Sequence, residues 1–340
     1  MKPVTLIISI LITLIVGFAA LVLIAMFMGG NGEEPYYYED NGSGYHAEAH
    51  QTAPATQAAA IHGLLSYIEY GDNRAYIFGS MHVGRPDMFP LAPVVMSAME
   101  RADVFAFEFD FNEEFSFEGI ITIFELMMLP EGETLETYLP PEAYAHLLHI
   151  LSTFDEFDMS EMEEIGAFRP AVIDLTLALL IDEIVGVDSM YSVDDFVFDF
   201  ANGLGRPVLG LATMEHQMSL LLAPPFDVEV AVVMSMTDQD TLANETRRLT
   251  EAYIYQDMVA LRRMVNAPVD RSNPAEVYMA DVMMRQRTGE FSAEIDRLLR
   301  ETEEPTTFFI TIGIAHLMHD LGNAFYNLEN MGHTINELWR

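Results

Sequence analysis

The chain has 340 residues, of which 51% are hydrophobic, and its 53 acidic and 16 basic side chains give a formal net charge of −37. A polyanion of this kind repels nucleic acid and attracts cations, so we expect no nucleic-acid partner. The absence of cysteine excludes disulfides, thiolate metal sites and a cysteine nucleophile. Any metal must therefore be bound by His, Asp or Glu, which favours a divalent ion such as zinc, manganese or cobalt.

The amino-terminal segment has the composition of a membrane anchor. Val4–Met28 is a run of 25 residues without a charge, long enough to cross a bilayer of about 30 Å. Lys2 precedes it and acidic residues follow it, which by the positive-inside rule predicts a cytoplasmic amino terminus and an extracytoplasmic remainder. A cleaved signal peptide is the alternative, but its apolar region is usually only about 7–15 residues long. We predict an uncleaved anchor over residues 1–28, in contact with membrane lipid.

Residues 29–60 are rich in Gly, Tyr, Ala, Thr and acidic residues and lack apolar periodicity, which predicts a flexible acidic linker. The remaining residues, 61–340, are enough to bury a sizeable core. We predict a single-pass protein of the cell membrane whose extracytoplasmic domain follows this linker.

The start of this domain predicts a sheet. Residues 64–79 form a hairpin pattern with Gly71-Asp72-Asn73 at the turn. An amphipathic helix is expected over Leu91–Arg101, followed by a strand in ADVFAFEFD, residues 102–110. A strand, a helix and a strand in this order are typical of a βαβ unit with parallel strands and a right-handed crossover.

Most of the remaining chain has helical periodicity. The expected helices are Phe115–Leu129, Pro141–Phe154, Pro170–Ile184, Val193–Leu204, Thr241–Val265, Ala275–Arg287 and His316–Met331. The further expected strands are Pro207–Leu211, Thr306–Ile312 and, at an edge, His333–Leu338. We therefore expect an α/β (α+β) fold: a mixed sheet with parallel βαβ units, a large helical insertion at about 115–205, and one preceding transmembrane helix.

One pattern occurs twice, near the two ends of this domain. Gly79-Ser80-Met81-His82 and Gly313-Ile314-Ala315-His316 each end a run of aromatic and β-branched residues. Such a run closed by Gly predicts a buried strand that enters a tight turn, because Gly tolerates positive φ and close backbone approach. Ligands of open α/β sheets bind at the carboxyl ends of the strands. We therefore expect His82 and His316 to face one crevice.

Glu108 is the acidic residue expected beside these histidines. A carboxylate between Phe107 and Phe109 on a central strand is costly to bury without a cation. With His82 and His316 it would give a divalent ion three ligands and leave a position for water, whose pKa the ion lowers. The metal-free alternative is a His general base oriented by Glu108, and core histidines bonded to the backbone are the structural alternative.

Four further residues are secondary candidates. Asp110 lies two residues beyond Glu108 and is a possible further ligand or partner of a ligand. Asp188, in Gly-Val-Asp-Ser, is better explained as a helix cap, and Glu215 as a charge in the first turn of a helix. His319 follows His316 on the same helical side, where exposure is the more frequent outcome. No phosphate-binding Gly-rich loop, Gly-x-Ser-x-Gly elbow or dinucleotide fingerprint is present.

Five motifs in a fixed order carry a family resemblance over residues 62–338. They are YIFGSMHVG, ERADVFAFEFD, LPEGETLETYLP, VGVDSMYSVDDFVFDFANGLGRPVLGLAT and ITIGIAHLMHDLG. Together they resemble the TraB/GumN family, which includes the Tiki proteins. The resemblance implies an α/β core with a helical insert and a membrane-anchored, metal-dependent peptidase. It also implies a site of His82, Glu108 and His316, with Gly79 and Gly313 as motif glycines.

The chain departs from the family pattern at three places. Ala212 stands where the family usually has Glu, no Arg-Asn pair is evident near Ala275, and His319 stands where Gly is common. Our first hypothesis is a membrane-anchored extracytoplasmic hydrolase, metal-dependent and acting on a peptide or protein. The second is a membrane-tethered protein that binds and sequesters a peptide or signal without turnover. A metal-free, esterase-like hydrolase is the third.

Overall fold

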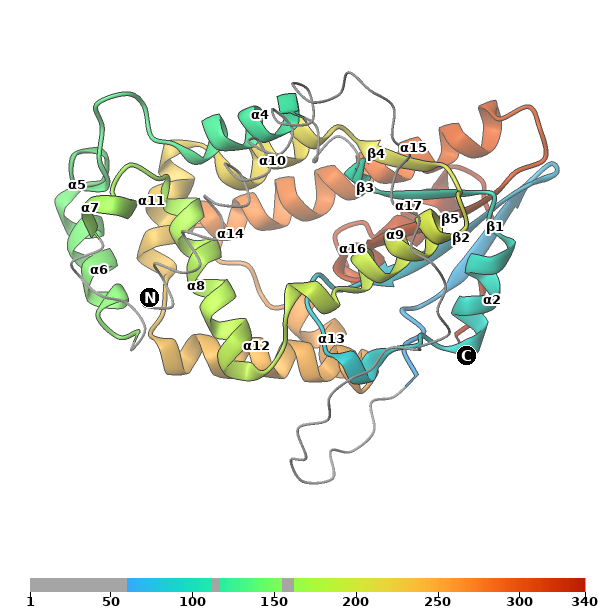
Figure 1. Cartoon of the computed structure of the whole chain (residues 1–340), viewed down its shortest axis with the longest axis horizontal. Coiled ribbons are helices and arrows are strands. Elements are labelled where there is room, and N and C mark those ends of the chain that lie inside the picture. The colour runs from blue at the N-terminus through green and yellow to red at the C-terminus, as the bar shows by residue number, and fades with distance from the viewer. Residues whose placement is uncertain (1–59, 112–116, 155–161, 340) are drawn as a thin grey trace, which may run out of the picture.

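The computed structural model describes residues 60–111, 117–154 and 162–339. They form a six-stranded mixed sheet with a body of helices beside it (Figure 1). In sheet order the strands are β4 (Val208–Ala212), β3 (Val104–Phe109), β5 (Thr307–Gly313), β2 (Asn73–Ser80), β1 (Ser66–Tyr70) and β6 (Asn336–Glu337). The four strands from β4 to β2 are parallel, and β1 and β6 are antiparallel additions. The expected α/β fold with a mixed sheet is confirmed.

The register of the two motif strands places the predicted histidine turns side by side. β2 and β5 are parallel neighbours, and Ser80 pairs with Gly313. Parallel neighbours end at the same edge of the sheet, so both Gly-x-x-His segments leave this edge together. β3 lies on the other side of β5 and brings Glu108 to the same edge.

The helices cover both faces of the sheet and extend beyond it. Their bounds are α2 (Pro93–Arg101), α4 (Phe117–Met127), α5 (Leu135–Tyr138), α6 (Pro141–Leu151), α7 (Met162–Ile165), α8 (Pro170–Val185), α9 (Val193–Gly203), α10 (Met214–Leu222), α11 (Phe226–Ser235), α12 (Gln239–Ile254), α13 (Met258–Val265), α14 (Pro274–Tyr278), α15 (Arg287–Glu301), α16 (Ala315–Met318) and α17 (Ala324–Asn330). Two 3-10 helices, η1 (Pro86–Met88) and η3 (Ser189–Tyr191), and a π-helical segment, η4 (Met279–Gln286), complete the described elements.

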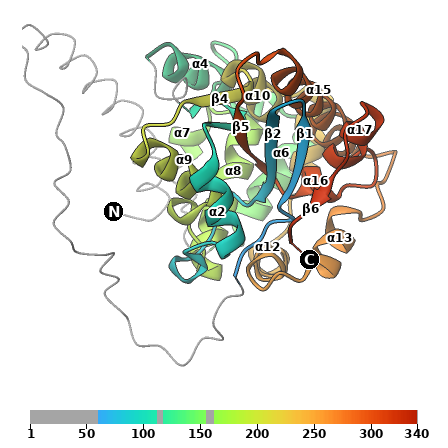
Figure 2. The ribbon, with the colours of Figure 1, turned by 90° about the vertical axis from the view of Figure 1, so that its right-hand side faces the viewer.

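Two hydrophobic cores correspond to these two parts of the molecule. The first surrounds the sheet, with α2 and α9 on one face and α15 and α17 on the other (Figure 2). The connection from β2 to β3 through α2 and the connection from β3 to β4 through α9 run along the sheet in one direction, whereas the connection from β4 to β5 through α15 runs in the other. Because such crossovers are right-handed, the two directions place their helices on opposite faces. The second core joins α6 and α8 to α11 and α12, so the helical body includes segments well beyond the insertion expected at about 115–205.

Two expected helices are wrong in their extent. The helix expected over Thr241–Val265 is two helices, α12 and α13, because Gln256 has φ +56° and ends the first of them. The helix expected over His316–Met331 is also two, α16 and α17, separated by Gly322 at φ +109°. In both places a left-handed residue reverses the chain inside an otherwise helical pattern.

The helix expected over Ala275–Arg287 is longer and less regular than its pattern indicates. Helical backbone runs without interruption through α14, the π-helical segment η4 and α15. A π-helical segment rotates the following residues relative to an α-helix, and such segments are frequent at functional sites. Here it immediately precedes Arg287 and Thr288.

Among the described residues, no single helix combines the length and the apolar character that a membrane span requires, although α10 and α11 do so as a pair bent by 58°. The predicted anchor, Val4–Met28, and the linker up to residue 59 lie outside the described residues.

Candidate functional site

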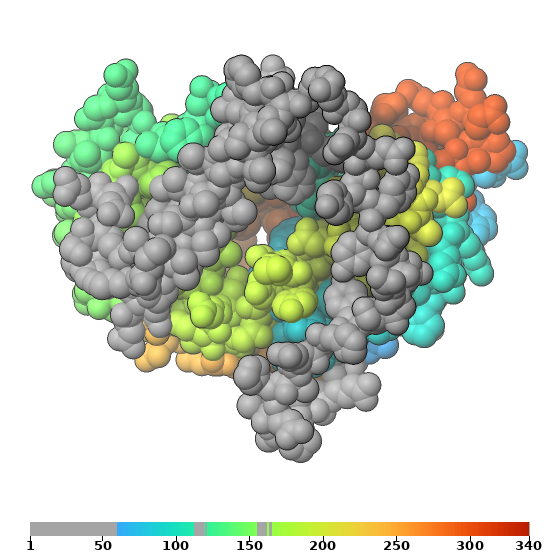
Figure 3. Space-filling model, in the orientation of Figure 1, coloured from blue at the N-terminus to red at the C-terminus, as the bar shows by residue number. Residues whose placement is uncertain are grey.

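A cavity of about 900 Å³ opens where β2 and β5 end. Its floor is formed by the two Gly-x-x-His segments and Glu108, and its walls come from α10, α12, α13 and the end of η4. In the space-filling view a hollow is visible near the middle of the face shown (Figure 3). The cavity therefore lies at the sheet edge where the sequence predicted a ligand site.

The structure brings the three predicted site residues together around Gly313. A methyl group built on Gly313 would lie 3.2 Å from Glu108 Oε1, 3.7 Å from His316 Cδ2 and 3.9 Å from His82 Nε2. His316 Nε2 is 3.7 Å from Glu108 Oε1. Two histidines from opposite ends of the domain and a carboxylate from a third strand thus surround one point.

Glu108 is buried and held by three donors. Arg287 Nη2 donates to its Oε2 at 2.5 Å, Gln217 Nε2 donates to Oε2 at 3.0 Å, and the Gly313 N–H donates to Oε1 at 2.8 Å. Burial alone would raise the pKa of Glu108, but His316 and His82 in their protonated forms, Arg287 and the Gly313 N–H lower this pKa to about 2. Because His316 is neutral at pH 7, Arg287 is the cation in direct contact that keeps Glu108 ionised.

His316 is buried and neutral. Thr288 Oγ1 lies 2.7 Å from its Nδ1 and donates its own proton to the Met284 carbonyl, so it accepts from His316 Nδ1–H. This assigns the lone pair to Nε2, which is directed toward Glu108. Burial lowers the pKa of His316 to about 4, although Glu108 favours the charged form.

His82 differs from His316 in exposure and charge. Its Nδ1 donates to Asp194 Oδ2 at 2.9 Å, while 71% of its side chain is exposed in the open cavity. The negative charge of Asp194 raises the pKa of His82 to about 9. His82 therefore binds a proton more readily than His316 does.

Sequence reasoning missed four partners of the site. They are Asp194 in the first turn of α9, Gln217 in α10, and Arg287 and Thr288 at the start of α15. In the sequence, the one indication of these partners is the pair of polar residues Arg287-Thr288 within a helical pattern. Only the fold shows that Arg287 contacts Glu108 of β3 and that Thr288 contacts His316 of α16.

Some buried polar atoms of residues that line the cavity have no partner among the described residues. They are Ser80 Oγ, Gln217 Oε1 and Arg287 Nε. Buried polar atoms are nearly always hydrogen-bonded. Their occurrence here indicates a cavity suited to polar groups, such as water or the polar atoms of a ligand.

The motif glycines are required for close approach. The sequence offered two reasons for glycine at these positions, positive φ and close backbone approach. Neither Gly79 nor Gly313 has a positive φ, so only close approach applies. A Cβ on Gly79 would lie 2.8 Å from the Gly63 carbonyl and 2.9 Å from Ile314 Cγ1. Tyr253 OH also donates to the Gly79 carbonyl at 2.9 Å, which fixes the strand end from the α12 side.

The secondary candidates do not line this cavity. Asp188 caps η3 by accepting from the Met190 N–H at 2.8 Å, as its sequence context indicated. Glu215 is exposed in the first turn of α10, and Asp110 follows β3. His319 is buried and accepts from the Leu321 N–H at 3.2 Å, so the expectation that it is exposed is wrong. It stabilises the turn after α16.

The donor types on the cavity floor suit a divalent ion. Each imidazole is held at Nδ1, by Asp194 or by Thr288, and this leaves Nε2 as the ligand atom, as in many metal sites. Glu108 Oε1 provides a carboxylate oxygen beside them. In the part of the chain that the structure describes, however, no three His, Asp or Glu side chains are arranged closely enough to hold a metal ion.

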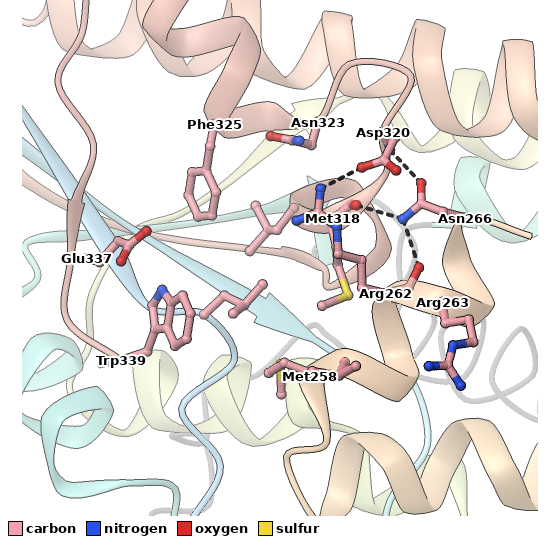
Figure 4. A pocket seen from close by; sticks show the side chains of 13 residues that line it. Met258, Arg262, Arg263, Asn266, Met318, Asp320, Asn323, Phe325, Glu337 and Trp339 are labelled. Atoms are coloured by element: carbon pink, nitrogen blue, oxygen red, sulfur yellow. Dashed lines mark hydrogen bonds and ion pairs between the residues drawn. The ribbon is translucent and has the colours of Figure 1, made fainter.

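A second cavity, of about 620 Å³, lies on the opposite side of α13 and contains none of the predicted site residues (Figure 4). Here Arg262 Nη2 pairs with Asp320 Oδ1 at 2.6 Å. Asn266 Nδ2 donates to the Met318 carbonyl at 3.1 Å, and its Oδ1 accepts from the Asp320 N–H at 2.6 Å. These bonds attach α13 to the turn that follows His316.

Comparison with known proteins is consistent with this architecture. The model of the TraB/PrgY/gumN family matches residues 64–337. The uncharacterized protein YbaP of Shigella flexneri is 25% identical over 253 residues, which cover 73% of this chain and 85% of YbaP. YbaP of Escherichia coli (strain K12) has the same identity and coverage, and no solved structure matches the chain. Because the family model covers most of its length, this chain belongs to the TraB/PrgY/gumN family.

Proposed function

We propose that this protein is a hydrolase of the peptidase type whose reaction takes place at His82, Glu108 and His316. One observation carries the proposal: atoms of these three residues surround a single point at Gly313, on the floor of a 900 Å³ cavity. Pairs of ionisable groups with pKa values shifted in opposite directions are typical of acid and base roles. His82 and His316 form such a pair.

The two histidines can divide the proton transfers of hydrolysis. Neutral His316 accepts a proton from water at Nε2 as the water oxygen attacks the carbonyl carbon. His82, held protonated by Asp194, donates a proton to the leaving nitrogen as the C–N bond breaks. Glu108, fixed by its three donors, provides the negative charge that stabilises the imidazolium formed at His316.

In the metal-dependent form of this proposal, the same three side chains, which are not close enough to hold an ion as the structure describes them, would come together around a divalent metal ion. Its ligands would be His82 Nε2, Glu108 Oε1 and His316 Nε2. When bound, such an ion polarises a carbonyl and lowers the pKa of a water molecule. A proton and a metal exclude each other at His82 Nε2, so metal titration separates the two forms.

The test uses the full chain, purified in a non-ionic detergent and treated with EDTA. Peptide mixtures are incubated with and without Zn²⁺, Mn²⁺ or Co²⁺, new termini are identified by mass spectrometry, and metal binding is measured by calorimetry. We expect cleavage that is lost in H82A and H316A and retained in H149A, a control at an exposed histidine of α6. Loss of metal binding in the same two variants supports the metal-dependent form, and full activity in EDTA supports the acid–base form.

One observation favours a second function, that of a tethered binding protein. Leu221 and Leu249, respectively 43% and 39% exposed, line the cavity and give it the character of a binding site. Saturable peptide binding without new termini under any metal condition would support sequestration and contradict the hydrolase.

We further propose that Val4–Met28 anchors the domain outside the cytoplasm. The support comes from the sequence: an uncharged 25-residue run, preceded by Lys2 and followed by acidic residues. The test is protease treatment of intact cells or spheroplasts. We expect the domain to be digested without lysis, whereas protection until lysis would contradict the proposed orientation.

A further inference from the structure

One wall of the site cavity is apolar. It is formed by Leu221 of α10, Leu249 of α12, and Leu261 and Met264 of α13. Leu261 is fully buried, whereas 43% of Leu221 and 39% of Leu249 remain exposed. Two large aliphatic side chains therefore border open space within the cavity.

This wall adjoins the candidate site directly. α13 packs against α16, the short helix that carries His316. Met264 on α13 and Ala315 beside His316 line the same cavity. A substrate whose carbonyl lies at His82 and His316 must therefore place its neighbouring groups along the apolar wall.

The composition of the wall selects for apolar groups. Covering exposed aliphatic surface with an apolar group is favourable in water, and a methionine adapts its shape to different side chains. The charged residues that also line the cavity away from the site, Asp182, Glu245 and Arg248, are of both signs. A cavity of about 900 Å³ is large enough for several residues of a peptide.

We propose that α10, α12 and α13 form a subsite that binds a bulky apolar side chain of the substrate, next to the bond that is cleaved. The preferred substrates are then peptides with Leu, Met or Phe at this position. Cleavage at that position rests on the proposed hydrolase function, whereas selective binding does not.

The test compares two fluorescein-labelled hexapeptides, one with Leu-Leu and one with Asn-Asn at its centre. Asn is close to Leu in size and differs in polarity. Binding to the full chain in lipid nanodiscs is measured by fluorescence anisotropy. We expect the Leu peptide to bind at least about tenfold more tightly.

Two variants locate the selectivity. Leu221 and Leu249 are already partly exposed. In L221Q/L249Q we expect the ratio of the two dissociation constants, Asn peptide to Leu peptide, to fall close to one. The matched control is L175Q on α8, because Leu175 is 48% exposed and does not line the cavity. This control should retain the full preference.

The outcomes distinguish this proposal from the hydrolase proposal. Equal binding of both peptides by the parent, or an unchanged preference in L221Q/L249Q, would overturn the subsite. Selective binding of the Leu peptide without cleavage supports the subsite and counts against the hydrolase. Equal binding and equal cleavage of both peptides leave the hydrolase standing and overturn the subsite.

Discussion

Glu108 determines the electrostatics of the site because it is buried and still ionised. Its contact with Arg287 joins β3 to α15, and both side chains are less than a tenth exposed. A buried pair of this kind adds little compared with an apolar pair, but removing one partner leaves an uncompensated charge. The pair therefore fixes the geometry of the site more than it stabilises the fold.

The substitution E108Q should destabilise the protein by about 3–5 kcal/mol, because Arg287 loses its counter-ion while it remains buried. Urea unfolding measures this change in the free energy of unfolding. The control E69Q removes the partner of Arg74 in an exposed pair and should cost less than about 1 kcal/mol. Equal effects of the two substitutions would contradict the role given to Glu108.

The substitution D194N tests the charge of His82 with its hydrogen bond preserved. Asp194 and Glu108 raise the pKa of His82 and Arg287 lowers it, so D194N should lower this pKa, as measured by NMR in the presence of EDTA. A pKa raised in the folded state stabilises the protein fully below the ordinary value of 6.5, and this contribution is lost as pH rises through about 9.

The difference in stability between the parent and D194N should accordingly be largest below pH 6.5 and should disappear above about pH 9. The free energy of unfolding measured at several pH values checks this. A difference that is constant across this range, or an unchanged pKa of His82 in D194N, would show that Asp194 does not control the proton on His82.

At the residue scale the sequence predicts the histidines and Glu108 and misses their partners. Glu108 is recognisable because it lies near the end of an apolar strand, and His82 and His316 because each lies three residues after a glycine that closes such a strand. Asp194 and Arg287 lie in helices, α9 and α15, whose amphipathic pattern does not indicate that either residue belongs to a site. Their role depends on contacts across 112 and 179 residues of sequence, which no local pattern encodes.

At the scale of elements, α13 and α16 form the partition between the two cavities. Asn266 holds this partition through bonds to Met318 and Asp320 (Figure 4). His316 lies two residues before Met318. The position of the imidazole therefore depends on a side chain outside the site cavity.

The substitution N266A should destabilise the protein by about 1–2 kcal/mol, because it removes a partly buried hydrogen bond to the Met318 carbonyl and an exposed one from the Asp320 N–H. Denaturant unfolding measures this. The control N244A on α12 removes only an exposed bond to Arg247 and should stay within about 0.5 kcal/mol. An effect of N266A as small as that of N244A would exclude the bracing role.

The sequence predicts the strands of the sheet well and the ends of the helices less well. β2, β3 and β5 follow from their apolar runs, and Gly71 at φ +60° makes the expected hairpin turn. The break at Gln256 was not predictable, because Gln carries no preference for a left-handed backbone. The break at Gly322 was more visible, since Gly adopts such a conformation at little cost.

At the scale of the whole molecule, the dominant property is the net charge of −37. Unbalanced like charges repel one another and destabilise the compact state. Salt screens this repulsion, since the Debye length falls from about 30 Å at 0.01 M to about 10 Å at 0.1 M.

The urea midpoint of the full chain should therefore rise as NaCl increases from about 0.01 M to about 0.5 M. Unfolding followed by circular dichroism in one non-ionic detergent checks this, with a neutral osmolyte as control for non-ionic effects. A midpoint that falls with salt would show that attractive ion pairs, rather than net repulsion, dominate the electrostatics of folding.

The central claim is that His82 and His316 act as one unit on one substrate. The most direct test is kcat/KM for peptide cleavage by H82A, H316A and the double variant H82A/H316A. We predict that each single substitution lowers kcat/KM by at least about 100-fold, and that the double variant is no worse than the poorer single variant, because groups that act together are not additive. Independent, multiplying effects, or full activity in either single variant, would contradict the account.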